Sequence, residues 1–141
     1  GERHPHGVTY DFVKKLNHNP KELEILGDGT ARKSYMYIGD CVDGFFMGYQ
    51  KAVGRTNLFN LGHEEYVNVK RVADIITDEM GLKDVKYNFT GGERGWIGDS
   101  PLVHLDTGKI RALGWKPKIS IEETIRRTVR WLLKNPYVYK R

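Results

Sequence analysis

Segments that predict strands alternate with segments that predict helices along the 141-residue chain, and this alternation limits the fold more than any other feature. Apolar residues recur at helical spacing within residues 9–16, 40–53, 68–80 and 121–135. Short apolar runs that predict strands occupy residues 23–26, 34–38, 57–61 and 85–89. No segment repeats another. The order predicts an α/β unit, or an α+β unit if the chain is considered in isolation.

Polar residues and glycines mark the ends of these segments. Gly27-Asp28-Gly29 predicts a tight turn, and Gly54 and Gly81 are expected to end helices. The residues expected to cap helix N-termini are Thr9, Asp40, Asn68, Asp106 and Ser120. Residues 90–100 contain four glycines and little periodicity, which predicts a long loop of the kind that often carries function.

Size and composition fit one domain of a globular protein. The longest apolar run is only a few residues, whereas a membrane-spanning helix needs about 20, so we expect no membrane partner. No charged and then apolar leader opens the chain, and we expect a cytoplasmic protein. Cys41 is the single cysteine, which excludes an internal disulfide and a cysteine-based metal cluster, and no histidine pair has zinc-hydrolase spacing.

The net charge of +5 is concentrated at the C-terminus. Residues 109–141 carry ten Lys/Arg against two Glu, whereas residues 1–108 carry thirteen against sixteen Asp/Glu. A basic nucleic-acid-binding domain is one reading of this pattern. However, Glu122 and Glu123 stand four residues before Arg126 and Arg127, which favours an exposed, ion-paired helix face. We therefore expect no nucleic-acid partner.

Four motifs occur in a characteristic order along the chain. The first runs from Gly27 to Asp40 and reads G-D-G-T-A-R-K-S-Y-M-Y-I-G-D. The others are Phe59-Asn60-Leu61-Gly62, Arg94 with Gly98-Asp99, and Asp106-x-x-Lys109 followed by Leu113-Gly114-Trp115-x-Pro117. Together they resemble the NAD-dependent epimerases and dehydratases of nucleotide sugars, which are extended short-chain dehydrogenases/reductases of the UDP-glucose 4-epimerase type. The resemblance covers almost the whole chain.

This resemblance implies that residues 1–141 form the C-terminal lobe of an extended Rossmann-type enzyme, a lobe that binds a nucleoside-diphosphate sugar. Lys33 and Arg94 match the cations that face the diphosphate, although the family usually has Arg at the first position. Glu24 and Leu26 match the strand whose backbone meets the nucleobase. Asp99 matches an acidic group near the ribose hydroxyls.

The cofactor-binding half of such an enzyme is not recognisable in this sequence. No G-x-G-x-x-G turn is present to seat a dinucleotide, so we expect no cofactor in this chain and NAD in its full-length parent. Tyr10 and Lys14 have the spacing of the family's catalytic pair but follow the segment where that pair belongs, so we assign no catalytic residue. We expect the chain to be inactive alone and to partner a missing N-terminal NAD-binding domain. The separated lobe should expose apolar surface where that domain packs, and we expect this surface to favour self-association, with a homodimer as one form.

The activity of the parent has one favoured interpretation and two alternatives. The favoured one is an epimerase that oxidises the sugar transiently and then returns the hydride. A nucleotide-sugar 4,6-dehydratase and a non-catalytic sugar-nucleotide-binding module remain open. The sequence leaves the nucleobase and the sugar unassigned.

Overall fold

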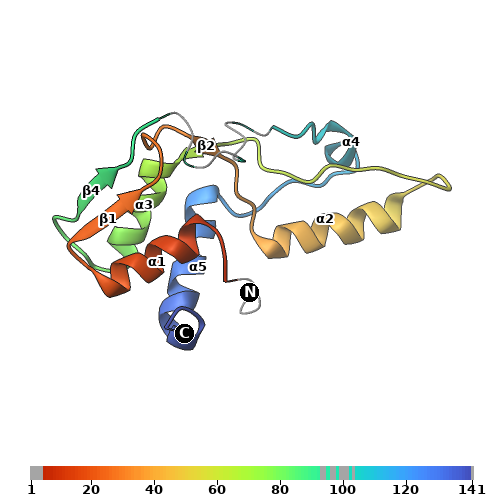
Figure 1. The fold of residues 1–141 in the computed structure, drawn as a ribbon. Helices are drawn as coiled ribbons and strands as arrows, with labels where there is room; N and C mark the ends of the chain where they lie inside the picture. The colour runs from red at the N-terminus through yellow and green to blue at the C-terminus, as the bar shows by residue number, and fades with distance from the viewer. Residues whose placement is uncertain (1–4, 93–94, 96–97, 99–101, 103, 141) are drawn as a thin grey trace.

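The computed structural model describes residues 5–92, 95, 98, 102 and 104–140. Along this part of the chain the elements, shown in Figure 1, are α1 (Val8–His18), β1 (Glu22–Ile25), β2 (Arg32–Lys33), α2 (Ile38–Lys51), β3 (Val67–Asn68), α3 (Val69–Glu79), β4 (Lys86–Phe89), α4 (Gly108–Arg111), α5 (Ile121–Lys134) and the 3-10 helix η1 (Pro136–Val138). This order confirms a mixed helix and strand fold.

The core lies where α1, α3 and α5 pack against one another and against β1. β1 pairs with β4 in parallel, and β2 pairs with β3 in an antiparallel manner, so two small sheets form. The fully buried side chains that hold these elements together include Val13, Leu16, Leu23, Ile25, Val72, Ile76, Ile125 and Val129. Those in α1, α3 and α5 come from the apolar faces that the helical spacing of the sequence predicts, and Leu23 and Ile25 come from one face of β1.

Helix α2 projects away from the three packed helices (Figure 1). Its buried residues are Asp40, Gly44 and Gly48, which are small or polar. Its large apolar side chains face solvent, with Phe45 65% and Tyr49 77% exposed. The described part of the chain therefore exposes apolar surface, as expected, and the partner that would cover this surface stays a prediction.

Several predicted helix ends agree with the structure. The side chain of Asn68 caps α3 by accepting the N–H of Arg71 at 2.7 Å, and that of Ser120 caps α5 by accepting the N–H of Glu123 at 3.2 Å. Three other predicted caps are wrong. Gly7 precedes α1 in place of Thr9, and α2 begins at Ile38, before Asp40. Thr107 precedes α4 in place of Asp106.

Two predicted strands are also wrong. Residues 34–38 do not form a strand, because the chain pairs at Arg32–Lys33 and has entered α2 by Ile38. Residues 57–61 have no strand partner among the described residues and are not assigned as a strand. Gly54 does not end α2, which stops at Lys51. No helix in the described part of the chain is long and apolar enough to cross a membrane.

Candidate functional site

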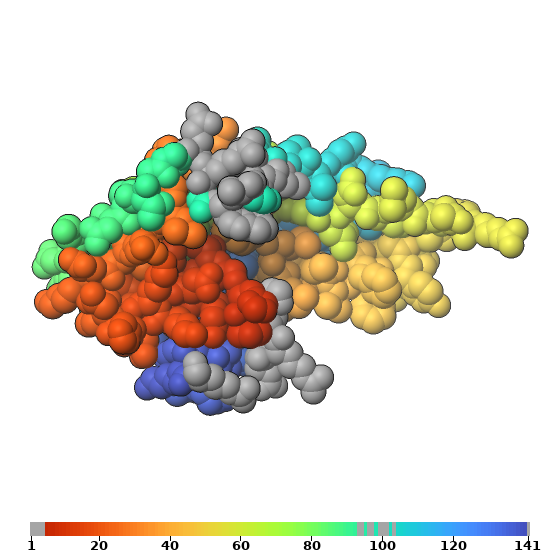
Figure 2. Space-filling view, in the orientation of Figure 1, coloured from red at the N-terminus to blue at the C-terminus, as the bar shows by residue number. Residues whose placement is uncertain are grey.

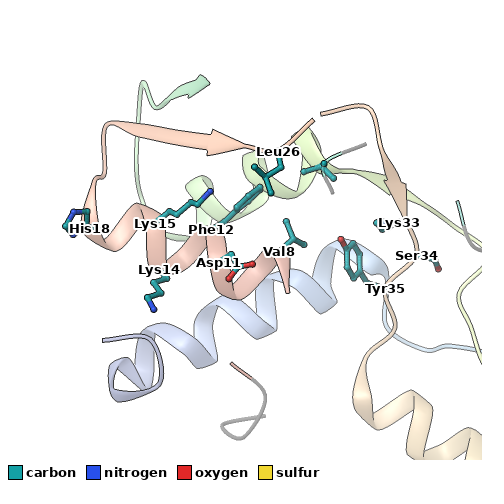
Figure 3. A pocket seen from close by; sticks show the side chains of 12 residues that line it. Val8, Asp11, Phe12, Lys14, Lys15, His18, Leu26, Lys33, Ser34 and Tyr35 are labelled. Carbon is teal, nitrogen blue, oxygen red and sulfur yellow. The ribbon is translucent and has the colours of Figure 1, made fainter. Parts of the chain in front are cut away.

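A cavity of about 760 Å³ lies between α1 and the segments that follow β1 and β2 (Figure 3). Helix α1 supplies one wall, and the chain around Leu26 and around Lys33 supplies others. The lining residues are Val8, Asp11, Phe12, Lys14, Lys15, His18, Leu26, Lys33, Ser34, Tyr35, Val69 and Gly95. The volume lies within the range of about 300–1,000 Å³ that ligand pockets occupy.

The turn after β1 brings the chain back toward this cavity. Gly27 and Gly29 have φ values of 82° and 81°, a backbone conformation that residues with a Cβ rarely adopt. A Cβ added to Gly29 would lie 2.5 Å from the ring of Phe89. Asp28 closes the turn by accepting the hydroxyl of Thr30 at 2.6 Å and its backbone N–H at 2.9 Å, and these bonds lower the pKa of Asp28. The two glycines therefore allow the tight turn that leads the chain from β1 into β2.

Cationic groups lie at both ends of the cavity, with apolar side chains between them. In Figure 3, Lys33 lies toward one end, and Lys15 and His18 lie toward the other. Phe12, Leu26 and the carboxylate of Asp11 lie between them. The ammonium of Lys15 donates to the carboxylate of Glu24 at 2.9 Å and to its backbone carbonyl at 3.2 Å. This hydrogen bond and the positive charge lower the pKa of Glu24. The arrangement suits an elongated ligand with an apolar middle and an anionic end.

The structure brings together part of the predicted site. Leu26 and Lys33 both line the cavity. Glu24 does not line it, but its side chain holds Lys15, which does. Arg94 and Asp99 lie outside the described residues.

Gly95 is the described residue nearest in sequence to Arg94, and it also lines the cavity. A Cβ added to Gly95 would lie 3.1 Å from both the Cβ and the carbonyl oxygen of Leu26. The backbone at Gly95 therefore approaches Leu26 more closely than a residue with a side chain would allow without a shift.

The wall contributed by α1 is the part of the site that the sequence motifs do not reveal. Val8, Phe12 and Lys15 recur at spacings of four and three residues, so they share one helix face. Phe12 is 5% exposed and also belongs to the core, which is the role that its helical spacing predicts. Only the packing of α1 beside Leu26 shows that the same face also borders a cavity.

The described residues offer neither a metal centre nor a dinucleotide turn. No group of three His, Cys, Asp or Glu in this part of the chain could hold a metal ion. The glycine turn at 27–29 leads from β1 into β2 and not into the N-terminus of a helix. It therefore does not present the helix N-terminus on which dinucleotide folds seat a pyrophosphate.

Comparison with known proteins shows that the chain is similar to parts of epimerases and dehydratases named for nucleotide sugars. Residues 1–62 match the model of the NAD dependent epimerase/dehydratase family. A putative UDP-glucose 4-epimerase of Methanocaldococcus jannaschii is 30% identical over 129 residues, which cover 92% of this chain and 40% of that protein. The dTDP-D-glucose 4,6-dehydratase of Mus musculus is 30% identical over 145 residues, which cover 98% of this chain and 39% of that protein.

Solved structures agree with the sequence matches. A crystal structure of a UDP-galactose 4-epimerase superposes with a TM-score of 0.78 at 29% identity and covers 96% of this chain and 42% of its own. A UDP-glucose 4-epimerase of Thermotoga maritima, crystallised with UDP-glucose, gives a TM-score of 0.74 at 26% identity, with 96% and 42% covered. The chain thus spans about two fifths of the length of these relatives.

Proposed function

The chain is related to the NAD-dependent epimerase/dehydratase family, and we propose that residues 1–141 are the C-terminal domain that binds the nucleotide sugar of such an enzyme. The observation that carries this proposal is the cavity beside α1, whose apolar middle lies between cationic ends. A nucleoside has a flat, partly apolar base and ribose, and its diphosphate is an anion. The nucleoside would lie along the apolar middle of the cavity, and the diphosphate would lie at the end that Lys33 lines.

Each part of the ligand has a matching wall. The apolar side chains of Phe12, Leu26 and Val69 surround the nucleoside and exclude water from it. The ammonium of Lys33 neutralises the diphosphate, and a charge-assisted hydrogen bond is strong in such a partly sheltered place. The backbone at Glu24 and Leu26 offers N–H and C=O groups to the edge of the base.

Two further groups complete the proposed site. Arg94 adds a second cation at the diphosphate, and a guanidinium can grip two phosphate oxygens at once. The position of Gly95 in the cavity lining supports this assignment for the neighbouring residue. Asp99 accepts hydrogen bonds from the ribose hydroxyls.

We assign the chemistry of the sugar to a part of the protein outside this chain. The relatives are longer than the chain, which spans only 40% of the Methanocaldococcus jannaschii protein. That additional part would be an N-terminal domain that holds NAD and the catalytic groups. There NAD would take a hydride from the sugar and return it, while this chain binds and orients the substrate.

The exposed face of α2 supports the existence of such a partner domain. Phe45, Phe46 and Tyr49 are 65%, 53% and 77% exposed, which is unusual for a helix with so many large apolar side chains. Figure 2 shows α2 and the segment after it extending away from the rest of the molecule. A second domain packed on this face would bury these side chains, and in its absence a second copy of the chain would do so.

A dehydratase is the second candidate for the parent activity. The mouse dTDP-D-glucose 4,6-dehydratase is as similar to the chain as the putative epimerase, at 30% identity. Both activities begin from a nucleoside-diphosphate sugar, so the proposed role of the chain is the same in either enzyme. A non-catalytic sugar-nucleotide-binding module would use the same cavity without the additional domain.

Calorimetric titration of the chain with UDP-glucose and with dTDP-glucose tests the binding role. Lys33→Ala is expected to weaken binding roughly 10- to 100-fold, because a charge-assisted hydrogen bond contributes about 1.5–3 kcal/mol. Arg32→Ala is the matched control, since Arg32 precedes Lys33 in β2 but does not line the cavity. Equal affinities for the two variants, or no binding by the unmodified chain, would contradict the proposal.

A further inference from the structure

Another cavity, of about 260 Å³, lies between the start of α1 and the C-terminal half of α5. The apolar and aromatic residues that line it are Val8, Tyr10, Tyr35, Trp131, Leu132 and Val138, and we call it the Trp131 cavity. We propose that the Trp131 cavity anchors an apolar side chain of an acidic peptide segment from a partner protein. This inference goes beyond the proposed function and does not depend on it.

The walls of the Trp131 cavity come from two helices that are fixed to each other. Helices α1 and α5 pack together (Figure 1), and the hydroxyl of Tyr10 donates to the backbone carbonyl of Val138 at 3.3 Å. Trp131 lines the cavity and is still 38% exposed, so a partner can reach it. Tryptophan and tyrosine provide much of the contact energy at protein interfaces. The cavity therefore offers a preformed, accessible aromatic wall.

The size of the Trp131 cavity limits what it can hold. Pockets for whole small-molecule ligands occupy about 300–1,000 Å³, and this cavity is smaller. Val8 and Tyr35 also line the larger cavity beside α1, whereas Tyr10 and Trp131 line only this one of the two. The Trp131 cavity therefore suits one side chain of a larger partner.

The charge of the C-terminal segment indicates that this partner is acidic. Residues 124–141 contain six Lys/Arg and no Asp or Glu. The three arginines of α5 form ion pairs with carboxylates of α3 and α5. Lys134 and Lys140 are exposed, and neither has a carboxylate partner among the described residues. Part of the basic excess is therefore not explained by the ion-paired helix face.

These lysines lie next to residues that line the Trp131 cavity. Lys134 follows Trp131 by three residues in α5, so the two side chains are neighbours on one helix face. Lys140 follows Val138 by two residues, beyond the end of the same helix. Neither lysine lines the cavity itself. One ligand can therefore contact both the aromatic wall and the lysines only if it extends past the cavity, as a peptide does.

Helix α1 adds a third cation on the other side of the cavity. The ammonium of Lys14 lies 5.9 Å from the centre of the Tyr10 ring, and it has no carboxylate partner in the described part of the chain. Asp11, which is adjacent to Tyr10 in sequence, lines the cavity beside α1 instead. Positive charge therefore lies near both walls of the Trp131 cavity, which favours carboxylates on either side of an apolar anchor.

Three labelled heptapeptides test the proposal by fluorescence anisotropy with the chain. The first has a central Phe between six acidic residues, the second has Ala in place of Phe, and the third has Gln in place of the acidic residues. We expect the first peptide to bind about fivefold or more tightly than each of the others, because only it uses both the aromatic wall and the lysines. Its binding should weaken as the salt concentration rises.

Two variants separate the apolar anchor from the charges. Trp131→Ala should remove the preference for Phe over Ala, and Lys134→Glu should remove the preference for acidic residues over Gln. The matched controls are Leu133→Ala and Lys116→Glu, which change exposed residues that do not line the cavity and should keep both preferences within about twofold. Lys134→Glu alters only an exposed side chain, so it tests the proposal even if Trp131→Ala weakens the fold.

Other outcomes overturn the proposal. It is wrong if the first peptide does not bind, if the Phe and Ala peptides bind equally, or if either preference survives its variant. Binding of the chain to phosphatidylserine vesicles without binding of the first peptide would indicate a membrane surface instead. The calorimetric titration with UDP-glucose tests the proposed function separately, so neither result decides the other.

Discussion

The carboxylate of Asp40 should be one of the most important side chains for the stability of this fold. Asp40 lies in the first turn of α2 and is 3% exposed. Its Oδ2 accepts the backbone N–H groups of Lys118 and Ile119, both at 3.1 Å. One buried carboxylate therefore fixes α2 to the segment that leads into α5.

Asp40→Ala should destabilise the chain by about 2–4 kcal/mol. A net contribution of about 1.5–3 kcal/mol is typical of a hydrogen bond to a charged group, and an N–H left without an acceptor costs about 1–3 kcal/mol more. The two N–H groups are only partly buried, so water replaces some of the lost interaction. The expected destabilisation is therefore smaller than the sum of these contributions. Asp40→Asn keeps an acceptor oxygen and should lose less.

Urea unfolding followed by circular dichroism measures this change. The matched control is Asp43→Asn, which removes the exposed ion pair between Asp43 and Lys118 at 2.6 Å. Because both partners are largely exposed, we expect the control to leave the unfolding midpoint nearly unchanged. An Asp40→Ala midpoint equal to that of the control would refute the reasoning.

Three further predictions concern an ion pair, the exposed helix and the turn. Arg130 and Arg126, both in α5, donate hydrogen bonds to the carboxylate of Glu79 and lower its pKa below the usual 4.5. The ionised carboxylate therefore stabilises the fold above pH 4.5, and this stabilisation is lost as the pH falls through the lowered pKa. The stability difference between the unmodified chain and Glu79→Gln, from urea unfolding, should therefore shrink from pH 6 to pH 3. Phe45→Ser should reduce self-association in sedimentation velocity, since Phe45 is 65% exposed, and an unchanged association would argue against an apolar contact. Gly29→Ala should lower the unfolding midpoint more than Gly91→Ala, because both glycines have positive φ but only a Cβ at Gly29 would clash with the ring of Phe89.

Local signals in the sequence predict local structure well. Asn68 and Ser120 cap helices as predicted, because a cap depends on a side chain and the backbone three residues later. Leu26 and Lys33, which are 7 positions apart in the sequence, line one cavity, and their roles in ligand binding stay predictions. In both cases the signal lies within a short stretch of chain.

Strands are harder to predict than helices because their hydrogen bonds join distant segments. Residues 57–61 have the composition of a strand, but the described part of the chain provides no strand beside them. Residues 34–38 also have the composition of a strand, yet the pairing with β3 occurs at Arg32 and Lys33. The wall that α1 gives to the cavity is missed for a related reason, since it depends on which elements pack beside that helix.

The packing of α2 explains why its aromatic side chains remain available. A Cβ added to Gly44 would lie 2.7 Å from Leu61 and 2.8 Å from the indole nitrogen of Trp115, and one added to Gly48 would lie 3.2 Å from Phe59. Only glycine lets the helix approach these neighbours so closely, so the side that faces the protein cannot hold large residues. The aromatic residues of α2 therefore lie on its other side and do not line the cavity beside α1. The proposed ligand cavity beside α1 and the exposed aromatic face of α2 are therefore separate surfaces, and each can be changed without altering the other.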